Sequence, residues 1–205
     1  MTSNEVINIL IGDLHFTYDD TKKIKIFVDE LIIYNKKYNL IGKSTLLDVW
    51  SRHVLDSAQL VKFIKFDGNL GLADLGTGGG LPGIILAIFN KNINFHVKLY
   101  EKSPVKCNFL VNIINKIQIN AEVLEGDYLK SKIKSYYITC RAFKKFPELL
   151  RVSREKINKP HKMIIMKGKN AQEDINYASK SYSFKYRLEN SITDSESKII
   201  ILRVN

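Results

Sequence analysis

An apolar segment that runs directly into a glycine-rich turn constrains the fold more than any other part of this chain. Residues 72–83 read Leu-Ala-Asp-Leu-Gly-Thr-Gly-Gly-Gly-Leu-Pro-Gly. Glycines after a strand let the backbone turn sharply and let a ligand approach without a Cβ in the way. The segment therefore predicts an α/β fold that binds a nucleotide-like cofactor at the end of a strand.

The chain after residue 66 alternates short apolar segments with helical ones. We expect strands at 70–75, 95–100, 121–124, 136–140 and 162–166, and helices at 83–89, 104–116 and 145–155. Strands that alternate with helices predict a parallel sheet with helices on both faces. Two further strand-like segments, 182–188 and 198–204, flank a polar connection and predict a hairpin. The expected sheet is seven-stranded and mostly parallel, with an antiparallel edge.

The first 66 residues predict helices. Apolar residues recur at helical spacing over 21–38, with Thr21 as the expected N-cap, and again over 44–64, with Ser44 as the expected N-cap. We therefore divide the chain into an N-terminal helical cap, residues 1–66, and a main domain, residues 67–205, which together form one compact unit.

Charge and cysteine content bound the partners and the compartment. The 205 residues carry 32 Lys and Arg against 21 Asp and Glu, a net charge of +11, so polyanions such as RNA are the first partners to consider. Cys107 and Cys140 fit no zinc-ligand spacing, and we expect two thiols and no metal. No signal peptide and no membrane span are expected. The interpretation is a cytoplasmic monomer.

Two kinds of cofactor fit the glycine-rich turn. Residues 78–83 satisfy Gly-x-Gly-x-x-Gly, and Glu101 follows at the separation of a ribose-binding acid, as in dinucleotide enzymes. Counted from Asp74, however, the pattern is Asp-x-Gly-x-Gly-x-Gly, as in S-adenosylmethionine-dependent methyltransferases. Acids follow or end three successive strands at Asp74, Glu101 and Asp127, and this combination favours S-adenosylmethionine. The glycines that we expect to contact it are Gly76, Gly78 and Gly80.

Over most of its length the sequence resembles the bacterial small-subunit ribosomal RNA guanine-N7 methyltransferases of the RsmG (GidB) type. The most specific elements are Arg-His-Val-Leu-Asp-Ser at 52–57 and Gly-Leu-Pro-Gly at 80–83. Residues 34–40, 106–110, 141–143 and 167–168 also match. Gly79 stands where the family usually has Pro or Ala, and residues 103–105 are less basic than the matching family stretch.

The resemblance implies a Rossmann-like S-adenosylmethionine-dependent methyltransferase fold. It also implies transfer of a methyl group to N7 of one guanine in 16S ribosomal RNA, on the small ribosomal subunit, with S-adenosylhomocysteine as the product. By position, the cofactor contacts it implies are Gly76, Leu81, Gly126, Asp127 and Arg141.

Guanine N7 carries a lone pair and no proton, so the reaction needs no general base. We expect Arg141, Lys167 and His53 to position the reactants, and Arg52, Lys106 and Lys167 to bind RNA. Simpler interpretations exist for two of these residues. Arg52 and Asp56 could form an ion pair along one helix, and His53 could hydrogen-bond Ser57.

Alternatives to this function remain open. The chain could methylate a protein or a small molecule, in which case its basic surface would be incidental. It could also be a non-catalytic RNA-binding assembly factor that keeps the pocket.

Overall fold

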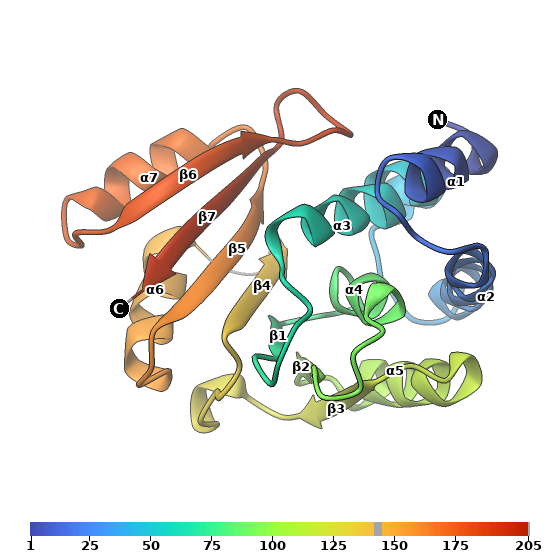
Figure 1. Cartoon of the computed structure of the whole chain (residues 1–205), viewed down its shortest axis with the longest axis horizontal. Coiled ribbons are helices and arrows are strands. Elements are labelled where there is room, and N and C mark those ends of the chain that lie inside the picture. Colours follow the sequence, from blue (N-terminus) through green and yellow to red (C-terminus); the bar gives the residue numbers. More distant parts are fainter. Residues whose placement is uncertain (142–144, 205) are drawn as a thin grey trace.

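A seven-stranded sheet forms the centre of the computed structural model, which describes residues 1–141 and 145–204 (Figure 1). The strand order is β3-β2-β1-β4-β5-β7-β6. The strands are β1 (Leu72–Leu75), β2 (Val97–Glu101), β3 (Ala121–Glu125), β4 (Tyr137–Arg141), β5 (His161–Lys167), β6 (Lys185–Asn190) and β7 (Lys198–Val204). β1 to β5 pair in parallel, and β7 runs antiparallel to both β5 and β6. The predicted mostly parallel sheet with an antiparallel edge is confirmed.

The helices of the main domain agree with the sequence at most positions. α4 (Gly83–Phe89) has the predicted bounds, while α5 (Pro104–Ile117) and α6 (Phe146–Lys156) each shift by one residue at one or both ends. Two helices were not predicted, α1 (Ser3–Gly12) and α7 (Ala171–Ser179).

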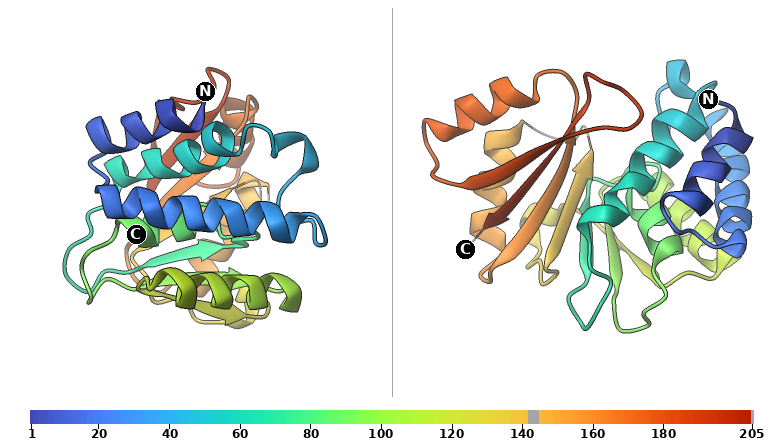
Figure 2. Two further views of the ribbon diagram at one scale, coloured as in Figure 1. Left: turned by 90° about the vertical axis from the view of Figure 1, so that its right-hand side faces the viewer. Right: turned by 45° about the horizontal axis from the view of Figure 1, so that its top comes forward.

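Apolar side chains pack in two layers, one on each face of the sheet. One cluster joins α4, α5 and the N-terminal helices to one face, and the other joins α6 and α7 to the opposite face. Two views from other directions show the same division, with the N-terminal helices beside α4 and α5 (Figure 2). Helices on both faces bury the central parallel strands β1, β4 and β5, while the edge strand β3 stays partly exposed.

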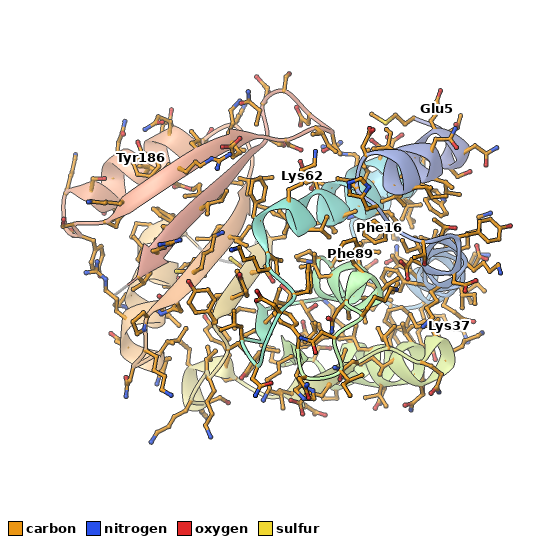
Figure 3. The ribbon with its side chains drawn as sticks, viewed as in Figure 1. Glu5, Phe16, Lys37, Lys62, Phe89 and Tyr186 are labelled. Carbon is orange, nitrogen blue, oxygen red and sulfur yellow. The ribbon has the colours of Figure 1, made fainter. Side chains whose placement is uncertain are left out.

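The N-terminal helices share a continuous core with the main domain. Phe16, from the connection after α1, packs on Phe89 of α4 with ring centroids 4.9 Å apart (Figure 3). The ring centroid of Phe27, in the helix that follows, lies 6.4 Å from that of Phe109 in α5. The boundary between residues 66 and 67 stays a prediction, because the hydrophobic core runs across it.

The first long helix, α2 (Tyr18–Asn35), begins earlier than predicted. Its N-cap is Thr17, whose hydroxyl accepts from the Asp20 amide at 3.2 Å while the Asp20 carboxylate accepts from the Thr17 amide at 2.9 Å. The expectation of Thr21 as the cap is wrong, because its hydroxyl instead donates to the Tyr18 carbonyl inside the first turn.

Thr17→Ala is expected to lower the free energy of unfolding by about 1 kcal/mol, because one orphan amide of α2 then loses its side-chain acceptor. Urea denaturation followed by circular dichroism measures the change. Thr17→Ser keeps the hydroxyl and is the control. Equal losses for both variants would contradict the capping role.

The second predicted helix, 44–64, is wrong as a regular α-helix. A 3-10 turn, η1 (Lys43–Thr45), is followed by a π-helix, η2 (Trp50–Leu55), then α3 (Asp56–Ala58) and a 3-10 segment, η3 (Gln59–Phe63). Ser44 is not a cap, and Leu47 is 97% exposed where the predicted stripe needed it buried. The π-helix changes the register of the side chains, and such π segments often occur at functional sites.

Candidate active site at the carboxyl end of the sheet

Glycines shape the loop between β1 and α4. Gly76, Gly78 and Gly80 have backbone φ values of 67°, 59° and 95°. Residues that carry a side chain rarely adopt this backbone conformation. A Cβ on Gly80 would lie 2.6 Å from Ile84 Cγ1 and 2.9 Å from Leu110 Cδ2. Gly80 thus packs against the core, whereas Gly76 and Gly78 lie on the walls of two cavities.

Asp74 holds the loop from behind. Its side chain is fully buried, and Oδ2 accepts from the Thr77 hydroxyl at 2.6 Å and from the Gly83 amide at 2.9 Å. Oδ1 accepts from the Thr139 hydroxyl at 3.3 Å. The structure therefore places Asp74 under the glycine-rich turn and away from the cavity walls. Burial raises the pKa of its carboxyl to about 6, against the lowering effect of these donors.

Asp74 should make stability fall as pH rises from about 4 to 6. Its pKa is about 6 in the folded protein and near 3.8 in the unfolded chain, so the folded state binds the proton more tightly. This contribution is fully present below pH 4 and is lost above pH 6, a change of about 3 kcal/mol. Asp74→Asn removes this pH dependence. The free energy of unfolding of the variant, minus that of the parent, should therefore increase from pH 4 to pH 6. Urea midpoints measured from pH 4 to 8 test this, with Asp29→Asn at an exposed site as the control. Parallel curves for Asp74→Asn and the parent protein would contradict it.

A cavity of about 310 Å³ lies where β1, β2 and β3 end. Glu101 lines it, and its Oε2 accepts from the Gly78 amide at 2.9 Å while Oε1 accepts from the Lys102 and Ser103 amides. Gly126 and Asp127 also line it, and the Asp127 carboxylate accepts from the Leu129 amide. Two carboxylates and bare glycine backbone suit the hydroxyl and amino donors of an adenosine group.

A second cavity, of about 250 Å³, lies on the other side of the glycine-rich turn. Gly76, Gly78 and Lys106 line both cavities, so the two are adjacent. Leu81, His53 and Arg141 also line the second one. Lys106, an expected RNA contact, thus lies beside the predicted cofactor loop.

A groove of about 740 Å³ opens next to this second cavity. Arg52 and Lys167, two of the predicted RNA contacts, lie on its walls. Lys167 Nζ also pairs with Asp174 Oδ2 at 2.5 Å. Arg141 lines both the groove and the second cavity, so it stands at their boundary.

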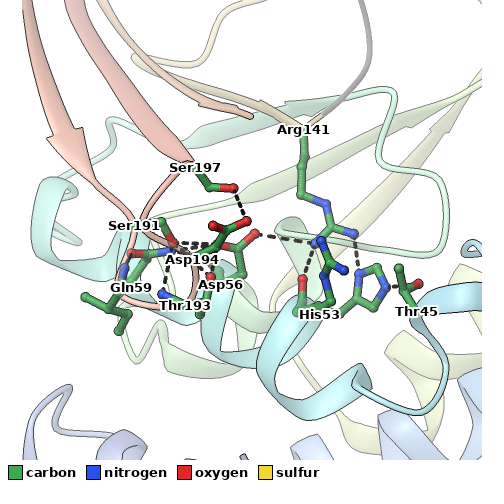
Figure 4. A network of polar contacts seen from close by, with 11 residues as sticks. Thr45, His53, Asp56, Gln59, Arg141, Ser191, Thr193, Asp194 and Ser197 are labelled. Carbon is green, nitrogen blue, oxygen red and sulfur yellow. Dashed lines mark hydrogen bonds and ion pairs between the residues drawn. The ribbon is translucent and has the colours of Figure 1, made fainter. Parts of the chain in front are cut away.

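Arg141 joins the end of β4 to the π-helix (Figure 4). Its Nη1 donates to the Arg52 carbonyl at 3.1 Å, and its Nη2 donates to His53 Nδ1. His53 Nε2 lies 2.7 Å from the Thr45 hydroxyl, which donates to the Gly42 carbonyl at 2.7 Å. Because Nδ1 accepts from Arg141, Nε2 carries the proton and donates it to the Thr45 hydroxyl.

The environment keeps His53 neutral. Burial, together with the positive charges of Arg141 and Arg52, lowers the pKa of the imidazole to about 3. Both ring nitrogens already have partners, so His53 orders the π-helix against β4. The alternative of a hydrogen bond between His53 and Ser57 is wrong, since the buried Ser57 hydroxyl has no partner in the described part of the chain.

Asp56 is a site residue that sequence reasoning considered only as the partner of Arg52. Its Oδ1 accepts from Gln59 Nε2 at 2.8 Å, the Thr193 hydroxyl at 2.9 Å and the Ser191 hydroxyl at 3.0 Å. Its Oδ2 lies 3.9 Å from Arg141 Nη1 (Figure 4). The alternative of an Arg52–Asp56 ion pair is therefore wrong, because Asp56 turns toward β4 and the β6–β7 connection.

The cysteines, the question of a metal site and the segment 141–143 can also be compared with the structure. Cys107 and Cys140 are buried free thiols, and burial raises the pKa of each. Within residues 1–141 and 145–204 no group of His, Cys, Asp and Glu could hold a metal ion, and no helix is long and apolar enough to cross a membrane. Of the matched segment 141–143, residues 142 and 143 lie outside the described residues.

Comparisons with solved structures agree on the fold. A methyltransferase from Aquifex aeolicus described as SAM-dependent superimposes with a TM-score of 0.60 at 14% identity, covering 92% of this chain and all of that one. An RNA methyltransferase from Salinibacter ruber, in complex with S-adenosylhomocysteine, superimposes with a TM-score of 0.54 at 13% identity, covering 72% and 89%. The predicted Rossmann-like methyltransferase fold is confirmed.

Sequence comparisons identify the family. A protein of Pelagibacter ubique named ribosomal RNA small subunit methyltransferase G is 32% identical over 183 residues, 87% of this chain and 85% of the relative. A protein of the same name from Rickettsia bellii is 34% identical over 179 residues, 87% and 91% of the two chains. The family model described as "GidB: rRNA small subunit methyltransferase G" matches residues 20–201. With the fold and the glycine-rich turn in agreement, the chain belongs to the rRNA small subunit methyltransferase G family.

Proposed function

We propose that this protein transfers a methyl group from S-adenosylmethionine to N7 of a guanine in 16S ribosomal RNA, and acts as a cytoplasmic monomer. One observation carries the proposal: Arg141 lines both the cavity beside the glycine-rich turn and the groove that holds Arg52 and Lys167. A cofactor in the first and a nucleotide in the second would meet at this residue. Family membership supports the same reaction.

The two cavities on either side of the glycine-rich turn fit the two halves of S-adenosylmethionine. Glu101 and Asp127 would accept from the ribose and adenine, and Gly76 and Gly78 leave room for the ligand. The methionine half would lie in the cavity lined by Leu81 and Arg141. Bound there, the sulfonium supplies an electrophilic methyl group.

For this reaction the main task of the protein is to orient the reacting atoms. Bound S-adenosylmethionine would give its methyl group to the N7 lone pair: the N–C bond would form as the C–S bond breaks, and the positive charge would pass from sulfur to the guanine. No proton would have to be removed from N7. A neutral His53 with both ring nitrogens engaged agrees with a site that lacks a general base. Alignment of the reacting atoms can supply roughly 7 to 11 kcal/mol of the barrier reduction.

Asp56 is suited to recognise the guanine. Three carboxylates line the groove. Asp48 is exposed, and both oxygens of Asp194 already accept hydrogen bonds, from the Glu196 amide and the Ser197 hydroxyl. Asp56 has only 17% of its side chain exposed, and three donors fix Oδ1 and leave Oδ2 facing Arg141. Through Oδ2 this fixed carboxylate can accept from guanine N1–H, whereas N1 of adenine carries no proton.

Asp56→Asn should slow methylation of the guanine roughly 10-fold, at the lower end of the ~1–3 kcal/mol that a good base contact contributes. It should also narrow the preference for guanine over adenine at the target position. Single-turnover rates on RNA carrying either base measure both effects. Asp48→Asn, on the same groove, is the control. An unchanged ratio of the two rates would contradict base recognition by Asp56.

The proposed function is tested by labelled methyl transfer and by mapping. Purified protein is incubated with labelled S-adenosylmethionine and, in separate reactions, small subunits, free 16S RNA and a protein extract. We expect label in ribosomal RNA, at one guanine N7, and loss of that N7-methylguanine from cells lacking the protein. Label confined to protein, or an unchanged map of the RNA, would overturn the proposal.

A further inference from the structure

A row of cations crosses three adjacent strands at the end of the sheet opposite the candidate site. Lys162 of β5 stands opposite Arg203 of β7, which stands opposite Lys185 of β6. We call these three residues the cation row. Register partners project from the same face of a sheet, so the three side chains leave the same face side by side.

This part of the sheet is open. Figure 1 shows α6 and α7 behind β5, β7 and β6, with the N-terminal helices to one side and no helix in front of β6 and β7. Arg203 and Lys185 are exposed, and a groove of about 700 Å³ is lined by the cation row together with Arg154 and Arg187. A ligand could therefore reach all three side chains.

The charges of the cation row are not neutralised within the described residues. Lys162 Nζ donates to the Phe63 carbonyl, and no ion pair is formed by any of the three. The neighbouring Arg187 pairs with Glu189. Burial, followed by the charges of Arg203, Arg187 and Lys65, lowers the pKa of the Lys162 amine. Like charges placed directly opposite each other weaken strand pairing, so this arrangement costs stability.

We propose that the cation row binds the phosphate backbone of ribosomal RNA at a second contact, away from the target guanine. A cluster of like charges that costs stability and that no ion pair neutralises is typical of a functional surface. Lys162 and Lys167 lie near opposite ends of β5, and the five steps along the strand between them separate the row from the groove by about 17 Å. The contact would therefore grip RNA that flanks the target and fix its register. This inference rests on the proposed function.

The test combines Lys185→Gln with Arg203→Gln in the full chain. Affinity for 16S RNA and the KM for small subunits should weaken roughly 5-fold to 10-fold, and the slope of log affinity against log salt should fall by about 1.4 to 1.8, the loss of two phosphate contacts. The affinity for S-adenosylmethionine should not change. The urea midpoint should stay the same or rise, because repulsion within the row is relieved, and a merely structural role would lower it.

A matched double variant, Lys22→Gln with Lys25→Gln, removes two exposed charges on α2, away from the row, and should leave the salt slope within about 0.5 of the parent value. Equal RNA affinity and salt slope for the row variant and the parent would overturn the proposal. Weaker binding to anionic vesicles with unchanged RNA binding would also overturn it, in favour of a membrane surface. Because RNA binding is measured without turnover, absence of methyl transfer by the parent protein would overturn the proposed function separately.

Discussion

Gly83→Ala is expected to lower the free energy of unfolding by about 3 kcal/mol. A Cβ at this position would lie 2.2 Å from Leu99 Cδ2 and 2.8 Å from Asp74 Oδ2, both of which are held in the buried sheet. Overpacking of this kind costs roughly 1–3 kcal/mol. The shift would also strain the bond from the Gly83 amide to Asp74, and loss of such a buried partner costs about 1–3 kcal/mol more.

Urea denaturation compares Gly83→Ala with Gly168→Ala, whose Cβ would meet nothing within 4 Å. The control substitution should change stability by less than about 1 kcal/mol, since it meets no steric barrier. Binding of S-adenosylmethionine by Gly83→Ala should weaken as well, because Asp74 no longer sets the path of the glycine-rich turn. Equal stability of the two variants would show that α4 can move away from β2 without cost.

The sequence predicts the local parts of this molecule well. The acids at the ends of β1 and β2, and Asp127 just after β3, lie where strand endings bring them together, because parallel strands present their carboxyl ends at one edge. Hydrophobic periodicity located all seven strands and three of the helices of the main domain. What it could not supply is the role of each acid: Asp74 supports the loop from beneath, while Glu101 and Asp127 line the cavity.

Two features of the site depend on contacts that no local pattern contains. Asp56 accepts hydrogen bonds from Ser191 and Thr193, which lie more than 130 residues later in the sequence. Nothing in the sequence distinguishes these two residues from the rest of the polar segment between β6 and β7. The π-helix is also hidden, because its apolar residues fit an α-helical stripe over a short window. The hydrogen bond between His53 and Arg141 is formed from within this π-helix, whose turns are wider than those of an α-helix. The two alternatives that the sequence offered, an Arg52–Asp56 pair and a His53–Ser57 pair, assumed α-helical spacings that the π-helix does not keep.

Arg141→Lys is expected to lower the rate of methyl transfer on the order of 10²-fold while it changes the affinity for S-adenosylmethionine only a few-fold. The Arg141 guanidinium donates at the same time to the Arg52 carbonyl and to His53, and it faces Asp56. A lysine carries the charge but not the planar fork, so it cannot hold these partners in one geometry. The groove and the cofactor cavity would then lose their common wall, and a displacement of about 1 Å at a reacting centre can cost about 10²-fold.

Single-turnover methylation of small subunits, with cofactor affinity from calorimetry, separates these two effects. Arg151→Lys is the matched control, because Arg151 pairs with Glu155 on the exposed side of α6 and should leave the rate unchanged. A proportional loss of cofactor affinity in Arg141→Lys would indicate that Arg141 acts mainly on the cofactor. A rate within about 3-fold of the parent would contradict the positioning role, since misalignment costs far more than that. Either result would leave Lys167 and Lys198, which also line the groove, as the remaining candidates for aligning the reactants.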